Sequence, residues 1–235
     1  CGKGNAKFIS IGCINIVVAA NAGGAYSPFG DITTLMVWQA GIVDFFTFFN
    51  IFIPSVVNYI IPATIMYFFI PKKSPEISTE KIFMKRGGKF IIFLGLLTIF
   101  CAVNFHNFLH LPPMLGMMLG LGFLSLYAFY LKITHNPSVE DNKFDFFRKI
   151  KNAEWDTLLF FFGVILSVGG LGFIGYLSLI SEFLYDGLGP TIANVIVGIL
   201  SAIVDNIPVM FAIITMRPEM SIDQWLLVTL TTGVG

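Results

Sequence analysis

Two short polar stretches interrupt an otherwise apolar sequence, and each of them carries an aspartate. The first, residues 21–34, contains Asn21, Ser27, Asp31, Thr33 and Thr34. The second, residues 201–210, contains Ser201, Asp205 and Asn206. Carboxylate, hydroxyl and amide oxygens are the ligands that hard cations such as sodium prefer. Burial disfavours the charged form of a carboxyl group and a bound cation favours it, so a proton and a cation would compete for such a site.

The composition indicates where these stretches lie. The 235-residue chain is 56% hydrophobic and only 12% charged, and its net charge is zero. The mean hydropathy is +0.82. These values predict an all-α polytopic protein of the cell (inner) membrane, whose first partner is the lipid bilayer. A neutral chain with its basic residues in loops argues against nucleic-acid binding.

Both polar stretches are predicted to break a helix inside the membrane. Glycine and proline disfavour helix here, at Gly23, Gly24, Pro28, Gly30 and Pro208. Backbone groups freed at membrane depth are tolerated only where they face protein or a water-filled cavity. An aspartate at that depth costs about 2.5 to 3.5 kcal/mol on insertion scales, so Asp205 is expected to face the bundle interior. Ser201 lies one helical turn before it, on the same face.

The apolar segments predict the path of the chain. Arms at 8–20 and 35–43 flank the first break, and each is too short to cross alone, so residues 8–43 are predicted to form one broken helix. The segments expected after it are a span at 45–70, a basic loop at 71–89, two spans within 90–131, a linker at 132–157 and a span at 158–180. The positive-inside rule places the basic loop in the cytoplasm. A kink or a close helix contact is expected at Gly169 and Gly170.

Residues 187–216 fit two geometries. They could form a re-entrant hairpin with its tip at Asp205, or one broken crossing with Arg217 on the far side of the membrane. The pattern alone does not decide between them. Because the chain starts without a methionine and stops inside an apolar run, we expect a piece of a longer protein, truncated at both ends.

Three segments resemble the signatures of NhaD-type sodium/proton antiporters of the ion transporter superfamily. They are residues 21–34, 154–161 (Glu-Trp-Asp-Thr-Leu-Leu-Phe-Phe) and 201–210. The resemblance covers nearly all of the chain. It implies a fold of two inverted repeats, each with one re-entrant hairpin and one broken helix that meet near the membrane midplane. Residues 1–70 would then end the first repeat, and residues 158–235 would supply the second-repeat span, the hairpin 187–216 and the start of the next broken helix.

The resemblance also implies a function. The parent protein would be a secondary active transporter, not an enzyme, that exchanges cytoplasmic sodium or lithium for external protons by alternating access and serves pH homeostasis. Asp31 and Asp205 would be the competing cation and proton sites. The hydroxyls and amides of the two stretches would complete the cation shell. We expect no cofactor and no metal beyond the transported cation, and a homodimer is compatible with this function.

The resemblance assigns proton or pH-sensing roles to Glu154, Asp156 and Thr157, although from the residues alone Asp156 and Thr157 indicate an ordinary helix N-cap. Plainer interpretations exist for the other residues too. Asp31 could be an N-cap, Asp205 and the two asparagines could bond neighbouring helices, and the hydroxyls could bond their own backbone.

Two other functions stay open from the residues. An arsenite or organic-anion carrier of the same superfamily would need basic groups near the polar stretches, and neither stretch contains Lys or Arg. An intramembrane aspartyl protease would also use two membrane aspartates. Its Gly-x-Gly-Asp motif is absent, because Pro28, Phe29 and Gly30 precede Asp31.

Overall fold

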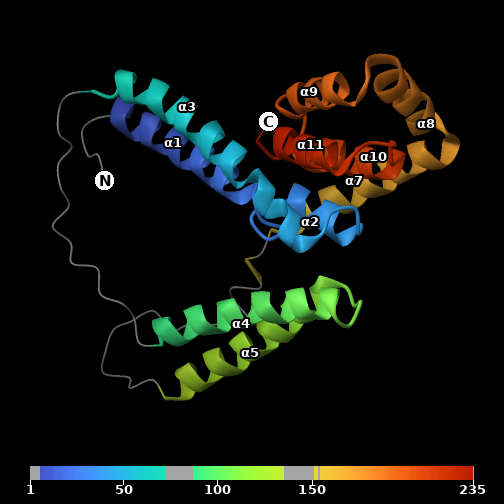
Figure 1. The fold of residues 1–235 in the computed structure, drawn as a ribbon. Coiled ribbons are helices and arrows are strands. Elements are labelled where there is room, and N and C mark those ends of the chain that lie inside the picture. Colours follow the sequence, from blue (N-terminus) through green and yellow to red (C-terminus); the bar gives the residue numbers. More distant parts are fainter. Residues whose placement is uncertain (1–5, 72–86, 135–150, 153, 235) are drawn as a thin grey trace. The chain divides into compact units, whose positions relative to one another are not determined.

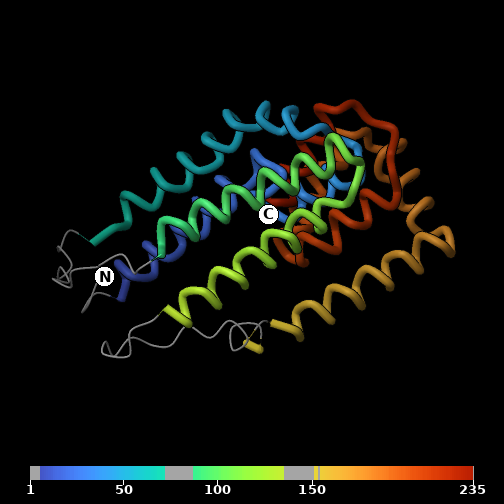
Figure 2. Tube along the Cα trace, turned by 90° about the horizontal axis from the view of Figure 1, so that it is seen from below, coloured from blue at the N-terminus to red at the C-terminus, as the bar shows by residue number. Residues whose placement is uncertain are grey.

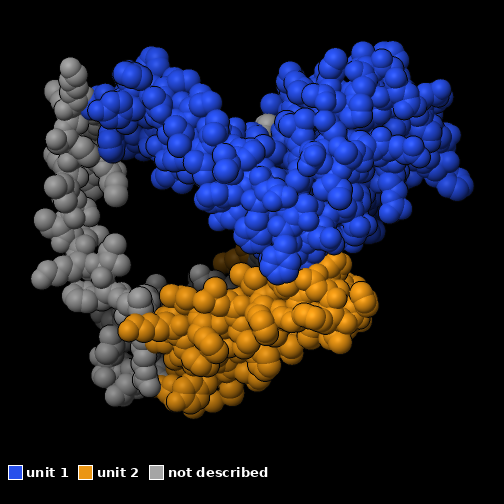
Figure 3. Space-filling model, in the orientation of Figure 1, with its two compact units in different colours: residues 1–79, 157–235 blue, residues 80–156 orange. Residues whose placement is uncertain are grey.

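The computed structural model describes residues 6–71, 87–134, 151–152 and 154–234, and every regular element in these ranges is a helix. The chain divides into two compact units, residues 1–79 with 157–235 and residues 80–156 (Figure 3). Among the described residues, five helices are long and apolar enough to cross a membrane: Ala6–Gly24, Phe45–Phe69, Gly88–Asn107, Pro113–Ile133 and Trp155–Ile174. The prediction of an all-α polytopic membrane protein is therefore confirmed.

The second unit is a pair of antiparallel helices, α4 (Gly88–Asn107) and α5 (Pro113–Ile133), which lie side by side in Figures 1 and 2. They match the two spans predicted within residues 90–131. Their backbones approach closely, since a Cβ atom on Gly116 would lie 2.5 Å from the Cα atom of Ala102. The predicted linker and basic loop fall mostly outside the described residues.

The predicted break in the first helix is present, but it starts later than the sequence suggests. Helix α1 (Ala6–Gly24) continues through Gly23 and Gly24, residues 25–31 are not α-helical, and α2 (Ile32–Gln39) follows. Glycine is tolerated there because helices commonly end on it. The expectation that each arm is too short to cross was wrong for the first arm, since the 19 residues of α1 reach membrane-spanning length.

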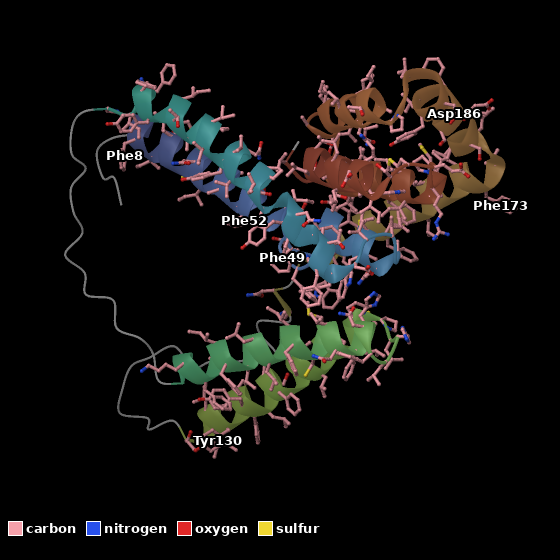
Figure 4. The ribbon with its side chains drawn as sticks, in the orientation of Figure 1. Phe8, Phe49, Phe52, Tyr130, Phe173 and Asp186 are labelled. Carbon is pink, nitrogen blue, oxygen red and sulfur yellow. The ribbon has the colours of Figure 1, made fainter. Side chains whose placement is uncertain are left out.

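Aromatic side chains pack around this break. The chain leaves α2 through the 3-10 helix η1 (Phe45–Ile51) and returns along α1 as α3 (Phe52–Phe69) (Figure 1). The ring of Tyr26, inside the break, lies 6.3 Å from that of Phe49 and 5.3 Å from that of Phe52, both labelled in Figure 4. The broken segment is thus held against the start of α3.

Helix α7 (Trp155–Ile174) ends before the predicted end of its span at Ile180. The reason is Gly175, whose φ of +95° lies in the left-handed region that glycine adopts without strain. The chain continues as α8 (Tyr176–Ser181) and the π-helical turn η2 (Glu182–Asp186). Gly169 and Gly170 lie inside helix α7, and no described atom outside their own helix backbone is within 4 Å of a Cβ built on either, so the expected close helix contact is not present among the described residues.

The last three helices reverse direction twice. They are α9 (Pro190–Ser201), α10 (Asn206–Met216) and α11 (Ile222–Val234). Gln224 Nε2 donates to Thr191 Oγ1 at 2.9 Å, where both α9 and α11 begin. Ser201 Oγ donates to the Thr232 carbonyl at 3.0 Å, where both end. Because α9 and α11 run parallel and α10 connects the end of one to the start of the other, the chain turns back at residues 202–205, as the hairpin geometry predicts.

A buried asparagine fastens α9 to α11. Asn194 is fully buried, and its side-chain nitrogen donates to both the backbone oxygen and the Oε1 atom of Gln224 at 3.0 Å. Its side-chain oxygen accepts from Tyr185 Oη at 3.2 Å. A buried amide is costly unless such bonds are made. The network therefore fixes how the two parallel helices sit against each other.

The apolar core of the first unit lies beside this network. It is formed by buried side chains of α2, η1, η2, α9, α10 and α11, including Val37, Trp38, Phe48, Met210 and Val228. These elements come from both ends of the sequence. The core therefore brings the first polar stretch to the last three helices.

Candidate functional site

Asp31 caps helix α2 and holds a second contact as well. Its backbone is extended, its Oδ1 atom accepts from the backbone N–H of Ile32 at 2.7 Å, and its Oδ2 atom accepts from Thr33 Oγ1 at 2.5 Å. Thr33 is fully buried and Asp31 is half-buried. The N-cap interpretation of Asp31 is therefore correct for one carboxylate oxygen, whereas the other is turned toward a buried hydroxyl.

The Oδ2 atom of Asp31 lies against the backbone of α11 at Gly233. A Cβ atom built on Gly233 would overlap Asp31 Oδ2 and would lie 2.9 Å from Thr33 Oγ1. Gly233 is buried. The carboxylate and the Thr33 hydroxyl thus occupy the space that any larger residue at position 233 would fill.

The Thr34 hydroxyl bonds backbone carbonyls of the break between α1 and α2. Its oxygen lies 2.9 Å from the carbonyl oxygen of Ser27 and 2.7 Å from that of Asp31, and its one proton serves one acceptor at a time. Gly30 donates its N–H to the same Ser27 carbonyl at 3.0 Å. The observed bonds of Thr34 are therefore to backbone, and Ser27 contributes its carbonyl to the closed loop.

The second polar stretch forms the turn between α9 and α10. Asp205 is exposed, and its Oδ1 atom caps α10 by accepting from the N–H of Ile207 at 3.1 Å. Ser201 is buried, and its Oγ atom lies 2.7 Å from Asn206 Oδ1 and 3.0 Å from the Thr232 carbonyl oxygen. Ser201 and Asn206 are thus joined to each other and to the end of α11.

The two stretches meet at consecutive residues. Gly233 touches the Asp31 carboxylate, and Thr232 accepts a hydrogen bond from Ser201. Helix α2 also packs against both α10 and α11. Two polar breaks that are distant in sequence therefore lie at one end of one helix, and together they present a carboxylate, hydroxyls, an amide and a carbonyl.

Other predicted site residues lie apart from this meeting point. Asn21 is exposed near the end of α1, where its carbonyl accepts from the N–H of Ala25 at 3.1 Å. Glu154, Asp156 and Thr157 are exposed at the start of α7. That helix begins at Trp155, so Asp156 lies in its first turn and is not its N-cap. The first-turn position still suits an acidic side chain, because the helix dipole is positive there.

The contribution of α11 to this site was not predicted from the sequence. Thr229, Thr232 and Gly233 are all buried, and the two hydroxyls donate to their own helix, at Trp225 O and Val228 O, both at 2.7 Å. The signal that could have found them is the spacing of small polar residues at 229 and 232, which places them on one helix face.

Comparisons with known proteins agree with the membrane architecture. The family model described as "Citrate transporter" (CitMHS) matches residues 5–233. No solved structure is significantly similar to the chain.

Several relatives carry sodium/proton antiporter names. The chain is 52% identical to the Na(+)/H(+) antiporter NhaD of Vibrio cholerae, over 100% of this chain and 53% of the relative. It is 51% identical to the NhaD antiporter of Alkalimonas amylolytica, over 99% and 52%. It is 30% identical to sodium/proton antiporter 2 of Arabidopsis thaliana, over 94% and 54%. The chain thus spans about half the length of these relatives.

Proposed function

The chain belongs to the citrate transporter family, and from this premise we propose that its full-length protein exchanges cytoplasmic sodium or lithium for external protons by alternating access. Two relatives, 52% and 51% identical to the chain, are named sodium/proton antiporters, and these names support the proposed exchange. The observation that carries the proposal is the meeting of two aspartate-bearing helix breaks at Thr232 and Gly233.

Asp31 is the central group of the proposed site. Its Oδ2 atom is held beside the Thr33 hydroxyl and away from the capping contact of Oδ1. A sodium ion would take this oxygen, the Thr33 hydroxyl and carbonyls of the break as ligands. A proton on the same carboxylate would remove the charge that attracts the ion, so the two cargoes exclude each other.

Asp205 is the second proposed carboxylate. It lies in the turn 202–205, next to Asn206, whose side chain contacts buried Ser201. Its exposure at the tip of the hairpin suits a group that exchanges protons or cations with a water-filled path. Ser201 and Asn206 would bind an ion in its passage between this turn and the end of α11.

Anion transport is the alternative, because the description of the family names citrate. Anion sites use Lys, Arg or free helix N-termini. Here the N-termini of α2 and α10 are both capped by aspartates, Asp31 and Asp205, and neither polar stretch contains a basic residue. Negative charge at both helix starts opposes an anion and favours a cation.

Inverted membrane vesicles that carry the full-length protein would test the proposal. A proton gradient is imposed, and its collapse on addition of sodium or lithium is followed with a pH-sensitive dye. We expect Asp31→Asn and Asp205→Asn to abolish this response at normal protein levels. Asp186→Asn is the matched control, since Asp186 is exposed in η2 and outside the polar stretches (Figure 4).

A wild-type protein with no cation response would contradict the exchange proposal, and citrate or arsenite uptake would then be measured instead. A normal response in Asp31→Asn would retain exchange and remove Asp31 from the site. Loss of the response in Asp186→Asn as well would point to a general effect of removing a carboxylate.

A further inference from the structure

Gly233 stands out among the described glycines because a functional carboxylate lies in the place of its missing side chain. Most close contacts of glycines in this structure are with backbone or with apolar or hydroxyl side chains, as for Gly116 against Ala102 and Gly198 against Thr231. At Gly233 the nearest atom to a built Cβ is Asp31 Oδ2, followed by Thr33 Oγ1. The packing of α2 on α11 is thus set at this position by polar ligand atoms.

We propose that Gly233 is a positioning residue for cation binding: it lets the Asp31 carboxylate reach the backbone of α11 and join the Ser201 and Asn206 cluster in one site. This inference rests on the proposed function. Gly233 supplies no ligand atom of its own. Its role is to leave space for the Asp31 carboxylate beside the backbone of α11, one residue from the Thr232 carbonyl, so that both oxygens can serve the same ion.

The geometry shows what a side chain would change. A methyl group at position 233 would overlap Asp31 Oδ2, so either the carboxylate or the helix must move. Thr33 cannot simply turn away, because it is fully buried and donates to that same oxygen at 2.5 Å. A displaced carboxylate would separate Asp31 and Thr33 from Thr232, and a displaced α11 would also disturb the contact between Ser201 and Thr232.

The effect should fall on sodium affinity more than on the amount of folded protein. A misplacement of about 1 Å at a binding constellation can cost up to roughly a hundredfold. We therefore expect Gly233→Ala in the full-length protein to raise the half-saturating sodium concentration by on the order of tenfold or more. Maximal exchange at saturating sodium should change less. Gly233→Val, with a larger side chain, should raise the half-saturating sodium concentration further.

Two matched glycine substitutions serve as controls. Gly116→Ala creates a similar clash, 2.5 Å from the Cα atom of Ala102, but in the α4–α5 pair. Gly169→Ala adds a methyl group where no described atom lies within 4 Å. Neither residue belongs to the proposed site. Both variants should keep the half-saturating sodium concentration within about twofold of wild type, whatever Gly116→Ala does to protein levels.

Asp31→Glu tests the contact between Asp31 and Gly233 by a change of the carboxylate instead of the glycine. It is the variant to use if Gly233→Ala does not accumulate in the membrane. It keeps the charge and adds one methylene group, and the face of Gly233 leaves no room for the longer side chain. We expect a raised half-saturating sodium concentration with exchange retained at high sodium.

The outcomes separate the two proposals. A wild-type protein without cation response overturns the proposed function and this inference with it. A responsive wild type with normal sodium affinity in Gly233→Ala or in Asp31→Glu overturns the inference alone. An equal rise in Gly116→Ala also overturns it, because the cause would then be helix packing in general.

Discussion

At the scale of single residues, each of the two aspartates caps a helix, and only one of them also reaches across to another element. Asp31 gives one oxygen to the N-terminus of α2 and the other to Thr33, beside Gly233. Asp205 gives one oxygen to the N-terminus of α10 and is otherwise exposed. Capping and cation binding are compatible in Asp31, because they use different oxygens.

The Thr33 hydroxyl offers a test of the Asp31 site at this scale. Replacing Thr33 by the isosteric Val removes the hydrogen bond to Asp31 Oδ2 and one proposed oxygen ligand, while it keeps the buried volume. A valine at this position would neither hold Asp31 Oδ2 in place nor offer an oxygen to the ion, and a loss of about 1.4 kcal/mol of binding free energy is a tenfold change, so we expect a rise on the order of tenfold in the half-saturating sodium concentration. Sodium titrations of exchange in vesicles would measure it.

Thr33→Ser is the matched control, because it keeps the hydroxyl and loses only a methyl group. It should remain close to wild type. If Thr33→Val and Thr33→Ser behave alike, the hydroxyl is not a ligand, and the packing of the methyl group explains the effect.

Residue types and spacing located the two polar stretches but not their meeting point. Carboxylates, hydroxyls and amides within apolar sequence were enough to identify Asp31, Ser201 and Asn206 as candidates. The contact of Asp31 with Gly233 could not be predicted in the same way, because it joins residues at opposite ends of the chain. Helical periodicity reports which residues share a face and contains no information on which helix that face meets.

At the scale of elements, the break between α1 and α2 is a tight crossing of two backbone segments. A Cβ atom on Gly24 would lie 2.5 Å from the Gly30 carbonyl oxygen, and a Cβ on Gly30 would overlap the Gly24 backbone. The sequence correctly predicts a break from its glycines and proline. It could not predict that α1 would run to Gly24, because a glycine near a helix end is compatible with either conformation.

Two adjacent glycines give a matched test of this crossing. Gly24→Ala should prevent the break from closing, since backbone atoms cannot move aside as side chains do. We expect much less folded protein, or a loss of stability of about 1 to 3 kcal/mol, the cost typical of overpacking. Gly23→Ala should be neutral or slightly stabilising, because no described atom lies within 4 Å of its Cβ position and alanine favours helix.

Thermal unfolding of the purified full-length variants in detergent would compare the two substitutions. Equal unfolding temperatures in Gly23→Ala and Gly24→Ala would contradict the crossing. The comparison isolates position, because the chemical change is identical and the residues are neighbours.

At the scale of the whole molecule, the sequence predicted the helical segments well and left the direction of the last helices open. Three of the five span-length helices lie close to the predicted spans, whereas α1 runs past its predicted arm to Gly24 and α7 ends before Gly175. Hydropathy fixes which segments suit a membrane, but it does not fix the direction of a segment of 12 residues such as α9. Hydrogen bonds at the starts and at the ends of α9 and α11 show that these two helices run parallel in the structure.

The reversal at residues 202–205 makes a topological prediction. If α9 and α10 form a hairpin that enters and leaves on one side, the loop before α9 and the loop after α10 face the same side of the membrane. Asp186, the last residue of η2, lies just before the connection to α9, Glu219 lies in the loop after α10, and both are exposed. We expect cysteines placed at 186 and 219, one at a time in a background without other cysteines, to react with an impermeant thiol reagent from the outside only.

A cysteine in the basic segment 72–86 should react from the cytoplasmic side, since positively charged loops stay inside. It calibrates the direction of labelling in the same vesicles. Labelling of position 219 from the cytoplasm together with labelling of 186 from outside would mean that α10 crosses the membrane. The turn at Asp205 would then be a bend in a continuous crossing, and Gln224 and Thr191 could not remain in contact, because α11 would start on the side of the membrane opposite to the start of α9 and could not run parallel to it. One labelling experiment therefore decides both the topology of the hairpin and the geometry on which the shared site depends.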